Sequence, residues 1–86
     1  MSEIGYAIAF GNDEDVKASK RLMVFQDHRA ASQTLERLES FGAGLYEVQL
    51  EEAPEWRPRK KRPQDWIAWC DVRWDDERGL VGRQAT

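Results

Sequence analysis

The chain contains one cysteine, Cys70, and one histidine, His28, which are its only candidates for cysteine–histidine nucleophilic catalysis. Such a nucleophile needs a neighbouring base that removes the thiol proton. Cys70 lies in the middle of an apolar run, and free cysteine is among the most buried residue types, so we interpret it as a core residue. His28 stands at the start of a segment with helical periodicity, and we interpret it as an exposed first-turn residue.

The sequence lacks the motifs that hold metals and cofactors. One cysteine and one histidine cannot make a four-ligand zinc site, and a lone cysteine cannot form an internal disulfide. Glycine-rich phosphate-binding motifs and the nucleophile elbow are absent. The acidic stretch 13–15 lacks the glycine that an EF-hand calcium loop requires. We therefore predict no catalytic residue, no metal site and no cofactor, and we expect that the protein is not an enzyme.

Carboxylates gather in three short stretches of the chain. An acidic surface of this kind attracts basic protein surfaces and repels nucleic acid at long range. We therefore expect a partner protein with a basic surface that binds nucleic acid. The carboxylates would take the positions that the phosphates of the nucleic acid otherwise occupy on that surface. The residues assigned to this role are Asp13, Glu14, Asp15, Glu51, Glu52, Asp75, Asp76 and Glu77.

The stretch 55–66, EWRPRKKRPQDW, concentrates positive charge in an otherwise acidic chain. The formal net charge is −3, from 13 basic and 16 acidic residues, and five of the basic residues fall here. Cations beside tryptophans could bind phosphates and stack on bases. Three interpretations remain open: a solvated or self-paired loop, a contact with a partner protein, and a nucleic-acid contact. The residues of the nucleic-acid alternative are Trp56, Arg57, Arg59, Lys60, Lys61 and Arg62.

Hydrophobic periodicity predicts four strands and one helix. Alternation of apolar and small or polar residues, with a period of two, indicates the strands. The helix is expected over 27–42, with Asp27 as its N-terminal cap and Gly42 at its end. The strands are expected at 4–10, 21–26, 45–50 and 66–74.

This order of elements, β-β-α-β-β, predicts an α+β domain with two layers, in which a four-stranded sheet carries one helix packed on one face. A right-handed crossover through the helix gives the strand order 1-2-3-4, and the helix could also return the third strand beside the first. Residues 1–86 make a single small domain. Within it we expect a long Pro/Arg/Lys-rich loop at 51–65 and a flexible tail at 76–86.

The last predicted strand presents two different faces. Trp66, Cys70 and Trp74 share one face, and Trp69 lies on the other. If the helix covers the first face, Trp69 is exposed and becomes a candidate anchor for a partner, as exposed tryptophans are at interfaces. A homodimer formed through that face or through an edge strand fits equally well.

The function that these features favour is binding. A lone cysteine fits a reducing compartment, and no segment reaches the length of a membrane helix, so we expect a cytoplasmic protein that does not associate with membranes. In size and charge, although in no motif, the chain resembles phage- or mobile-element-encoded antagonists such as anti-CRISPR and anti-restriction proteins. The first hypothesis is therefore an inhibitor or adaptor that acts by protein–protein contact, and the alternative is a nucleic-acid-binding accessory protein that uses the basic 57–62 loop.

Overall fold

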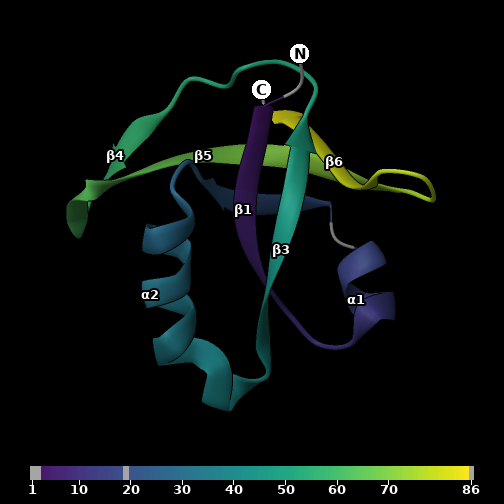
Figure 1. Cartoon of the computed structure of the whole chain (residues 1–86), viewed down its shortest axis with the longest axis horizontal. Coiled ribbons are helices and arrows are strands. Elements are labelled where there is room, and N and C mark those ends of the chain that lie inside the picture. The colour runs from purple at the N-terminus through teal and green to yellow at the C-terminus, as the bar shows by residue number, and fades with distance from the viewer. Residues whose placement is uncertain (1–2, 19, 86) are drawn as a thin grey trace.

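The strands of the computed structural model form one sheet that curls into a closed barrel (Figure 1). The structure describes residues 3–18 and 20–85. The strands are β1 (Glu3–Phe10), β2 (Arg21–Phe25), β3 (Ala43–Leu50), β4 (Arg57–Arg59), β5 (Arg62–Asp75) and β6 (Gly79–Gln84). The helices are α1 (Asp13–Lys17) and α2 (His28–Leu38), with a short 3-10 turn, η1 (Glu39–Phe41), after α2.

The sheet has the strand order β2-β1-β3-β6-β5-β4, and an additional pairing of β2 with β5 closes it. The barrel therefore contains five strands, and β4 is an extra strand beside β5. All pairings are antiparallel except the parallel pairing of β3 with β6. The length of β5, 14 residues, makes closure possible because it pairs with β2 along one edge and with both β4 and β6 along the other.

The predicted fold class is wrong, because an open four-stranded sheet under one helix is not what forms. The periodicity located β1, β2, β3 and most of β5 but missed β4 and β6, and it could not show that the second and last predicted strands pair with each other. The third predicted strand, β3, does lie beside β1, as in one of the two strand orders left open.

Small and branched aliphatic side chains fill the barrel interior. The small face of β1, with Gly5, Ala7 and Ala9, is buried. A Cβ added at Gly5 would collide with Cγ1 of Val24. A barrel of so few strands leaves little room inside, so the bulky face of β1 points outward instead. The other interior residues are Val24, Val48, Leu50, Ala68, Cys70, Val72 and Leu80, and Val16 of α1 joins the same cluster.

Helix α2 packs against the outside of the barrel (Figure 1). Asp27 caps it by accepting a hydrogen bond of 3.1 Å from the backbone N–H of Arg29, as predicted. Ala31 is fully buried, and with Ala30 it covers Phe25 of β2. The helical segment ends at Gly42, whose φ of +83° is the left-handed conformation that glycine adopts readily.

Three segments expected to be irregular contain regular structure. Residues 76–86, expected as a flexible tail, contain β6, which lies between β3 and β5. The expected loop 51–65 contains β4 and the start of β5. The segment 11–20 between the first two predicted strands, for which no helix or strand was predicted, contains α1, which begins with a reciprocal capping box between Asn12 and Asp15. Residue 19 of that segment and residue 86 of the tail lie outside the described residues.

Candidate functional site

The five clustered cations belong to the hairpin formed by β4 and the start of β5, and two of them are tied to the rest of the domain. Arg59 donates a hydrogen bond of 3.3 Å from Nη1 to Oγ1 of Thr34. Arg62 donates one of 3.2 Å from Nη2 to Oε1 of Gln33. Both acceptors are on α2, so the two arginines hold the hairpin against that helix. The guanidinium of Arg59 also lies over the ring of Phe25, 5.7 Å from its centroid.

Asp65 is the buried anion of this hairpin, with 4% of its side chain exposed. Its Oδ2 lies 3.2 Å from Nε of Arg62 and 3.8 Å from Nη1 of Arg59. The shorter contact is an ion pair in which the N–H of Arg62 is not aligned well enough with Oδ2 of Asp65 to form a hydrogen bond. Both Nε of Arg62 and Oδ2 of Asp65 are buried. One carboxylate thus faces two guanidinium groups, so part of the hairpin's charge is neutralised within the domain.

The remaining cations of the hairpin line a groove of about 630 Å³. The groove opens where β4 begins and β6 ends, along the edge of β5 that these two strands share. A hydrogen bond of 2.7 Å from the backbone N–H of Glu55 to Oε1 of Gln84 joins the two strand ends. The lining residues are Glu55, Arg57, Arg59, Lys60, Lys61, Ile67, Ala68, Trp69, Gln84 and Ala85.

Cationic groups in this groove are available to a ligand. Among the described residues, Arg57 pairs only with Glu55, at 3.1 Å, and both side chains are well exposed. Lys60 and Lys61 are exposed and form no ion pair with any described residue. The groove therefore carries more positive than negative charge, with Glu55 as its one carboxylate.

Trp69 is the exposed aromatic residue of the groove, with 56% of its surface accessible. Its neighbours Ala68 and Cys70 point into the barrel, so Trp69 points outward, on the face opposite Cys70, as the alternation on the last predicted strand indicated. The premise of that prediction is wrong, because α2 packs on the outer face beside Phe25 and Ile67 rather than on the face of Cys70. Trp56, expected as a stacking platform, is instead half-buried against the barrel core with its indole N–H enclosed. Only the side-chain alternation along 66–74 could have directed attention from Trp56 to Trp69.

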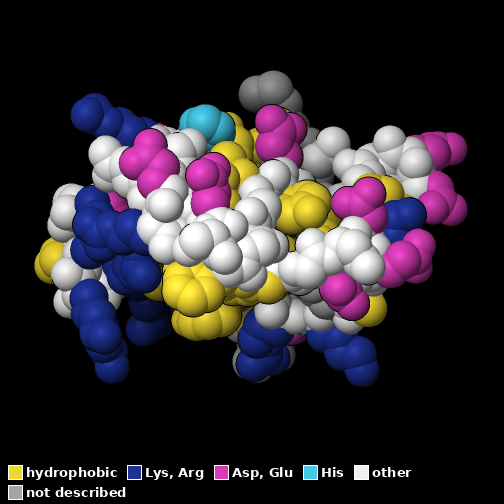
Figure 2. Space-filling model, turned by 90° about the horizontal axis from the view of Figure 1, so that it is seen from below, with side chains coloured by type: hydrophobic (Ala, Val, Ile, Leu, Met, Phe, Trp, Pro, Cys, Tyr) yellow, Lys and Arg dark blue, Asp and Glu magenta, His cyan; other side chains and the backbone are white. Residues whose placement is uncertain are grey.

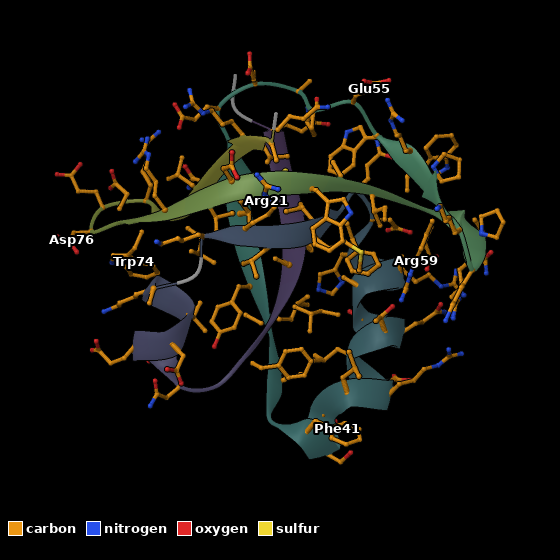
Figure 3. The ribbon with its side chains drawn as sticks, turned by 180° about the vertical axis from the view of Figure 1, so that it is seen from behind. Arg21, Phe41, Glu55, Arg59, Trp74 and Asp76 are labelled. Atoms are coloured by element: carbon orange, nitrogen blue, oxygen red, sulfur yellow. The ribbon has the colours of Figure 1, made fainter. Side chains whose placement is uncertain are left out.

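The acidic residues of α1 and of the β5–β6 turn lie at the opposite end of the molecule. Figure 3 shows Trp74 and Asp76 at one end and Arg59 at the other. Trp74 joins the two acidic stretches, because its Nε1 donates to Asp76 at 3.2 Å and its ring lies 5.0 Å from Nζ of Lys17. A hollow of about 250 Å³ lies between α1 and Trp74 and is lined by Asp13, Val16, Lys17, Tyr46 and Trp74.

Several of the carboxylates assigned to a partner already have structural roles. Asp15 belongs to the capping box of α1. Asp75 accepts hydrogen bonds from the backbone N–H groups of Glu77 and Arg78, at 2.9 and 3.0 Å, and these bonds hold the pKa of Asp75 below its ordinary value. Glu51 accepts from Arg73 at 2.9 Å. Asp13, Glu14, Glu52 and Glu77 form no ion pair with described residues.

The charges are thus sorted over the surface. Figure 2 shows Lys and Arg side chains at the left and along the lower edge of the view, whereas Asp and Glu lie mainly in the upper half and at the right. The lower edge of that view is the side of the barrel formed by β2 and β5, which faces the viewer in Figure 3. The sequence predicted an acidic body with one basic loop. The structure shows that the basic character extends from the hairpin along one face of the barrel.

Cys70 and His28 have separate environments. Cys70 is fully buried inside the barrel, where desolvation first and the charge of Asp71 second raise the pKa of its thiol from 9.0 to about 11. His28 is exposed at the start of α2, outside the barrel. Its ring packs edge-on against Tyr6 at 5.0 Å, and its Nδ1 lies 3.3 Å from Oγ of Ser32. Neither environment supplies the thiolate that nucleophilic chemistry requires.

Comparisons with known proteins add no assignment: no protein-family model matches the chain, and no curated protein or solved structure gives a significant match. Among the described residues, no helix combines the length and the apolar character needed to cross a membrane.

Proposed function

We propose that the protein binds single-stranded nucleic acid in the groove between the β4–β5 hairpin and the end of β6. The observation that carries the proposal is the position of Trp69, a largely exposed indole on the wall of a groove that also contains Arg57, Lys60 and Lys61. Exposed aromatic rings stack on unpaired bases, and neighbouring cations bind the phosphates of the same strand. The groove places both kinds of group on one surface.

A single strand is the expected ligand because stacking on Trp69 requires a base that is free of its partner. In a duplex the faces of the bases are covered by their neighbours, so an indole cannot stack on them, and the hairpin cations contact mainly the backbone. Backbone contacts alone give binding without preference for sequence and with strong salt dependence. We therefore expect tighter binding to an oligothymidine than to a duplex of equal length. We place this activity in the cytoplasm, where a single unpaired cysteine stays reduced.

The test is the fluorescence anisotropy of a labelled 15-residue oligothymidine titrated with the protein at low and moderate salt. Trp69→Ala should weaken binding by about 1–3 kcal/mol, the usual effect of one stacking residue. Trp74→Ala is the matched control, because Trp74 is also an exposed tryptophan of β5 but lies at the acidic end. Lys60→Ser/Lys61→Ser should weaken binding to every sequence and reduce its salt dependence.

Absence of binding by the wild-type protein at low salt would refute the proposal. Equal effects of Trp69→Ala and Trp74→Ala would also refute it, because the groove would then have no special role. Circular dichroism of each variant, together with its urea midpoint, establishes that the compared proteins are folded.

The acidic end supports a second candidate function, the binding of a basic protein segment. The specific observation is that Asp13 of α1 and Trp74 of β5 line one hollow, and that Asp76 of the β5–β6 turn accepts a hydrogen bond from the indole of Trp74. An arginine-rich peptide should then bind the wild-type protein and lose affinity when the free carboxylates are neutralised in Asp13→Asn/Glu14→Gln/Glu77→Gln. If the triple variant binds the peptide as well as the wild type does, this candidate is excluded.

A further inference from the structure

We propose that the bound strand continues past Trp69 along the outer face of β5 to a second phosphate contact at Arg83, with Arg21 beside it. This inference rests on the proposed function and extends its site. The strand register carries it, because the register fixes which side chains flank Trp69 on the outer face.

The outer face of β5 forms rows with the strands on either side. Asp71 lies opposite Arg83 of β6 and opposite Arg21 of β2. All three side chains point outward, because their chain neighbours Leu22, Val72 and Gly82 face the barrel interior. Directly opposite residues in a sheet are neighbours on the same face. Arg83, Asp71 and Arg21 therefore make one row across the face.

Trp69 lies two residues before Asp71, and the row on its other side also ends in a cation. Ile67 lies opposite Arg57 of β4. Two residues along a strand span roughly 6.6 Å, so Arg57 and Arg83 lie diagonally on either side of the indole. A base stacked on Trp69 thus has one guanidinium group towards each end of its backbone.

The second row carries one uncompensated positive charge. Arg21 donates from Nε to Oδ1 of Asp71 at 3.1 Å, and both side chains are about half exposed. Arg83 is exposed and forms no ion pair within the described part of the chain. Asp71 would repel a phosphate, but Arg21 neutralises it. Arg83 is therefore the group that remains for the ligand.

The surface is hollowed on both sides of the second row. A second hollow, of about 310 Å³, is lined in part by Asp71, Arg73 and Arg83, and Glu51 on its rim is paired with Arg73 at 2.9 Å. The first groove ends at Gln84 and Ala85, the residues that follow Arg83 on β6. Figure 3 shows Arg21 between the Arg59 end and the Asp76 end of the molecule, on the face turned to the viewer. The track thus crosses the middle of the face and stops short of the acidic end.

The experiment measures the salt dependence of binding of a 15-residue oligothymidine to three single variants. Arg83→Gln should weaken binding about tenfold at low salt and reduce the slope of log K against log salt by about 0.7, the contribution of one phosphate contact to a single strand. Arg37→Gln, an exposed cation in the last turn of α2, is the matched control and should change neither quantity.

Asp71→Asn provides a test that misfolding cannot imitate, because it should tighten binding. The substitution removes the one carboxylate of the second row and frees Arg21 for a phosphate, so affinity should rise severalfold and the slope should steepen. If wild type binds but Arg83→Gln matches Arg37→Gln, the extended track is excluded and the groove remains. If Asp71→Asn leaves affinity unchanged or lower, the track is likewise excluded. If wild type does not bind at all, both proposals fail.

Discussion

The buried carboxylate Asp65 is expected to stabilise the domain far more than its surface counterparts do. We predict that Asp65→Asn lowers the free energy of unfolding by about 2–3 kcal/mol. Removing one partner of a fully buried ion pair costs about 3–5 kcal/mol, because the remaining charge is left uncompensated. The two partners here, Arg59 and Arg62, keep 27% and 22% of their side chains exposed. Water therefore screens part of the remaining charge, and the expected loss of about 2–3 kcal/mol lies below the range for a fully buried pair.

The assay is urea denaturation followed by tryptophan fluorescence and circular dichroism. A domain of 86 residues has a total stability of roughly 4–13 kcal/mol, so the predicted loss is a large fraction and is readily measured. Asp71→Asn is the matched control because it breaks an arginine–aspartate pair of similar length, 3.1 Å, that lies on the surface. Exposed pairs contribute about 0–1 kcal/mol.

Comparable losses in the two variants would refute the reasoning, because burial would then have no bearing on the strength of the pair. A loss below about 0.5 kcal/mol in Asp65→Asn would refute it as well, since the two arginines would then be satisfied by Thr34, Gln33 and water alone.

Two further predictions concern the barrel interior. Gly5→Ala should lower the free energy of unfolding by about 2 kcal/mol, within the usual range for an overpacked core, because the added methyl group collides with Val24. A urea unfolding curve that superimposes on that of wild type would contradict this prediction, because Val24 would then move aside without cost. The pKa of Cys70 is 9.0 in the unfolded chain and about 11 in the folded protein, so the stability that depends on its neutral thiol is intact below pH 9 and is lost by pH 11. Between these two pH values the free energy of unfolding of wild type should fall by roughly 2–3 kcal/mol more than that of Cys70→Ala. Parallel plots of the free energy of unfolding against pH would contradict the burial of the thiol.

Local patterns predicted the elements of this fold but not their assembly. Alternation located β1, β2, β3 and most of β5, and the cap at Asp27 and the glycine at Gly42 marked the ends of the helical segment. These signals depend only on residues close in sequence. Closure depends on the pairing of β2 with β5 across some forty residues, and no local pattern reports it.

Strand β6 was missed because its residues have little strand propensity of their own and instead fit the space that their neighbours in the barrel leave. Its sequence, GLVGRQ, contains two glycines, which are unfavourable inside strands. A Cβ added at Gly82 would lie 3.0 Å from Val48 and 3.2 Å from Val72, so a larger residue there would crowd the barrel interior. The small face of β1 has the same cause. The alternation of large and small residues in β1 was visible in the sequence, but only the closed barrel shows that the small side chains fit a narrow interior.

The sequence showed which charged residues make up the site, but not which of them stabilise the fold and which remain available to a ligand. The sequence showed five cations and an adjacent Asp65, without indicating that this aspartate is buried between two of them. Arg59 and Arg62 therefore stabilise the hairpin, while Arg57, Lys60 and Lys61 remain for a ligand. A count of charges cannot make that division, because it depends on which side chains the fold buries.

Net charge is for the same reason a poor guide to what this protein binds. The formal charge of −3 argues for repulsion of a polyanion only if the charges act together. At physiological ionic strength the interaction between exposed charges fades over about 8 Å, whereas the molecule is 33 Å long and carries Asp76 and Arg59 at opposite ends. A phosphate beside Lys60 therefore experiences mainly the hairpin, and the distant carboxylates chiefly set the orientation in which the protein approaches a strand. Neutralising the acidic end should accordingly leave the affinity of the groove almost unchanged at physiological salt and raise it only when the salt is removed.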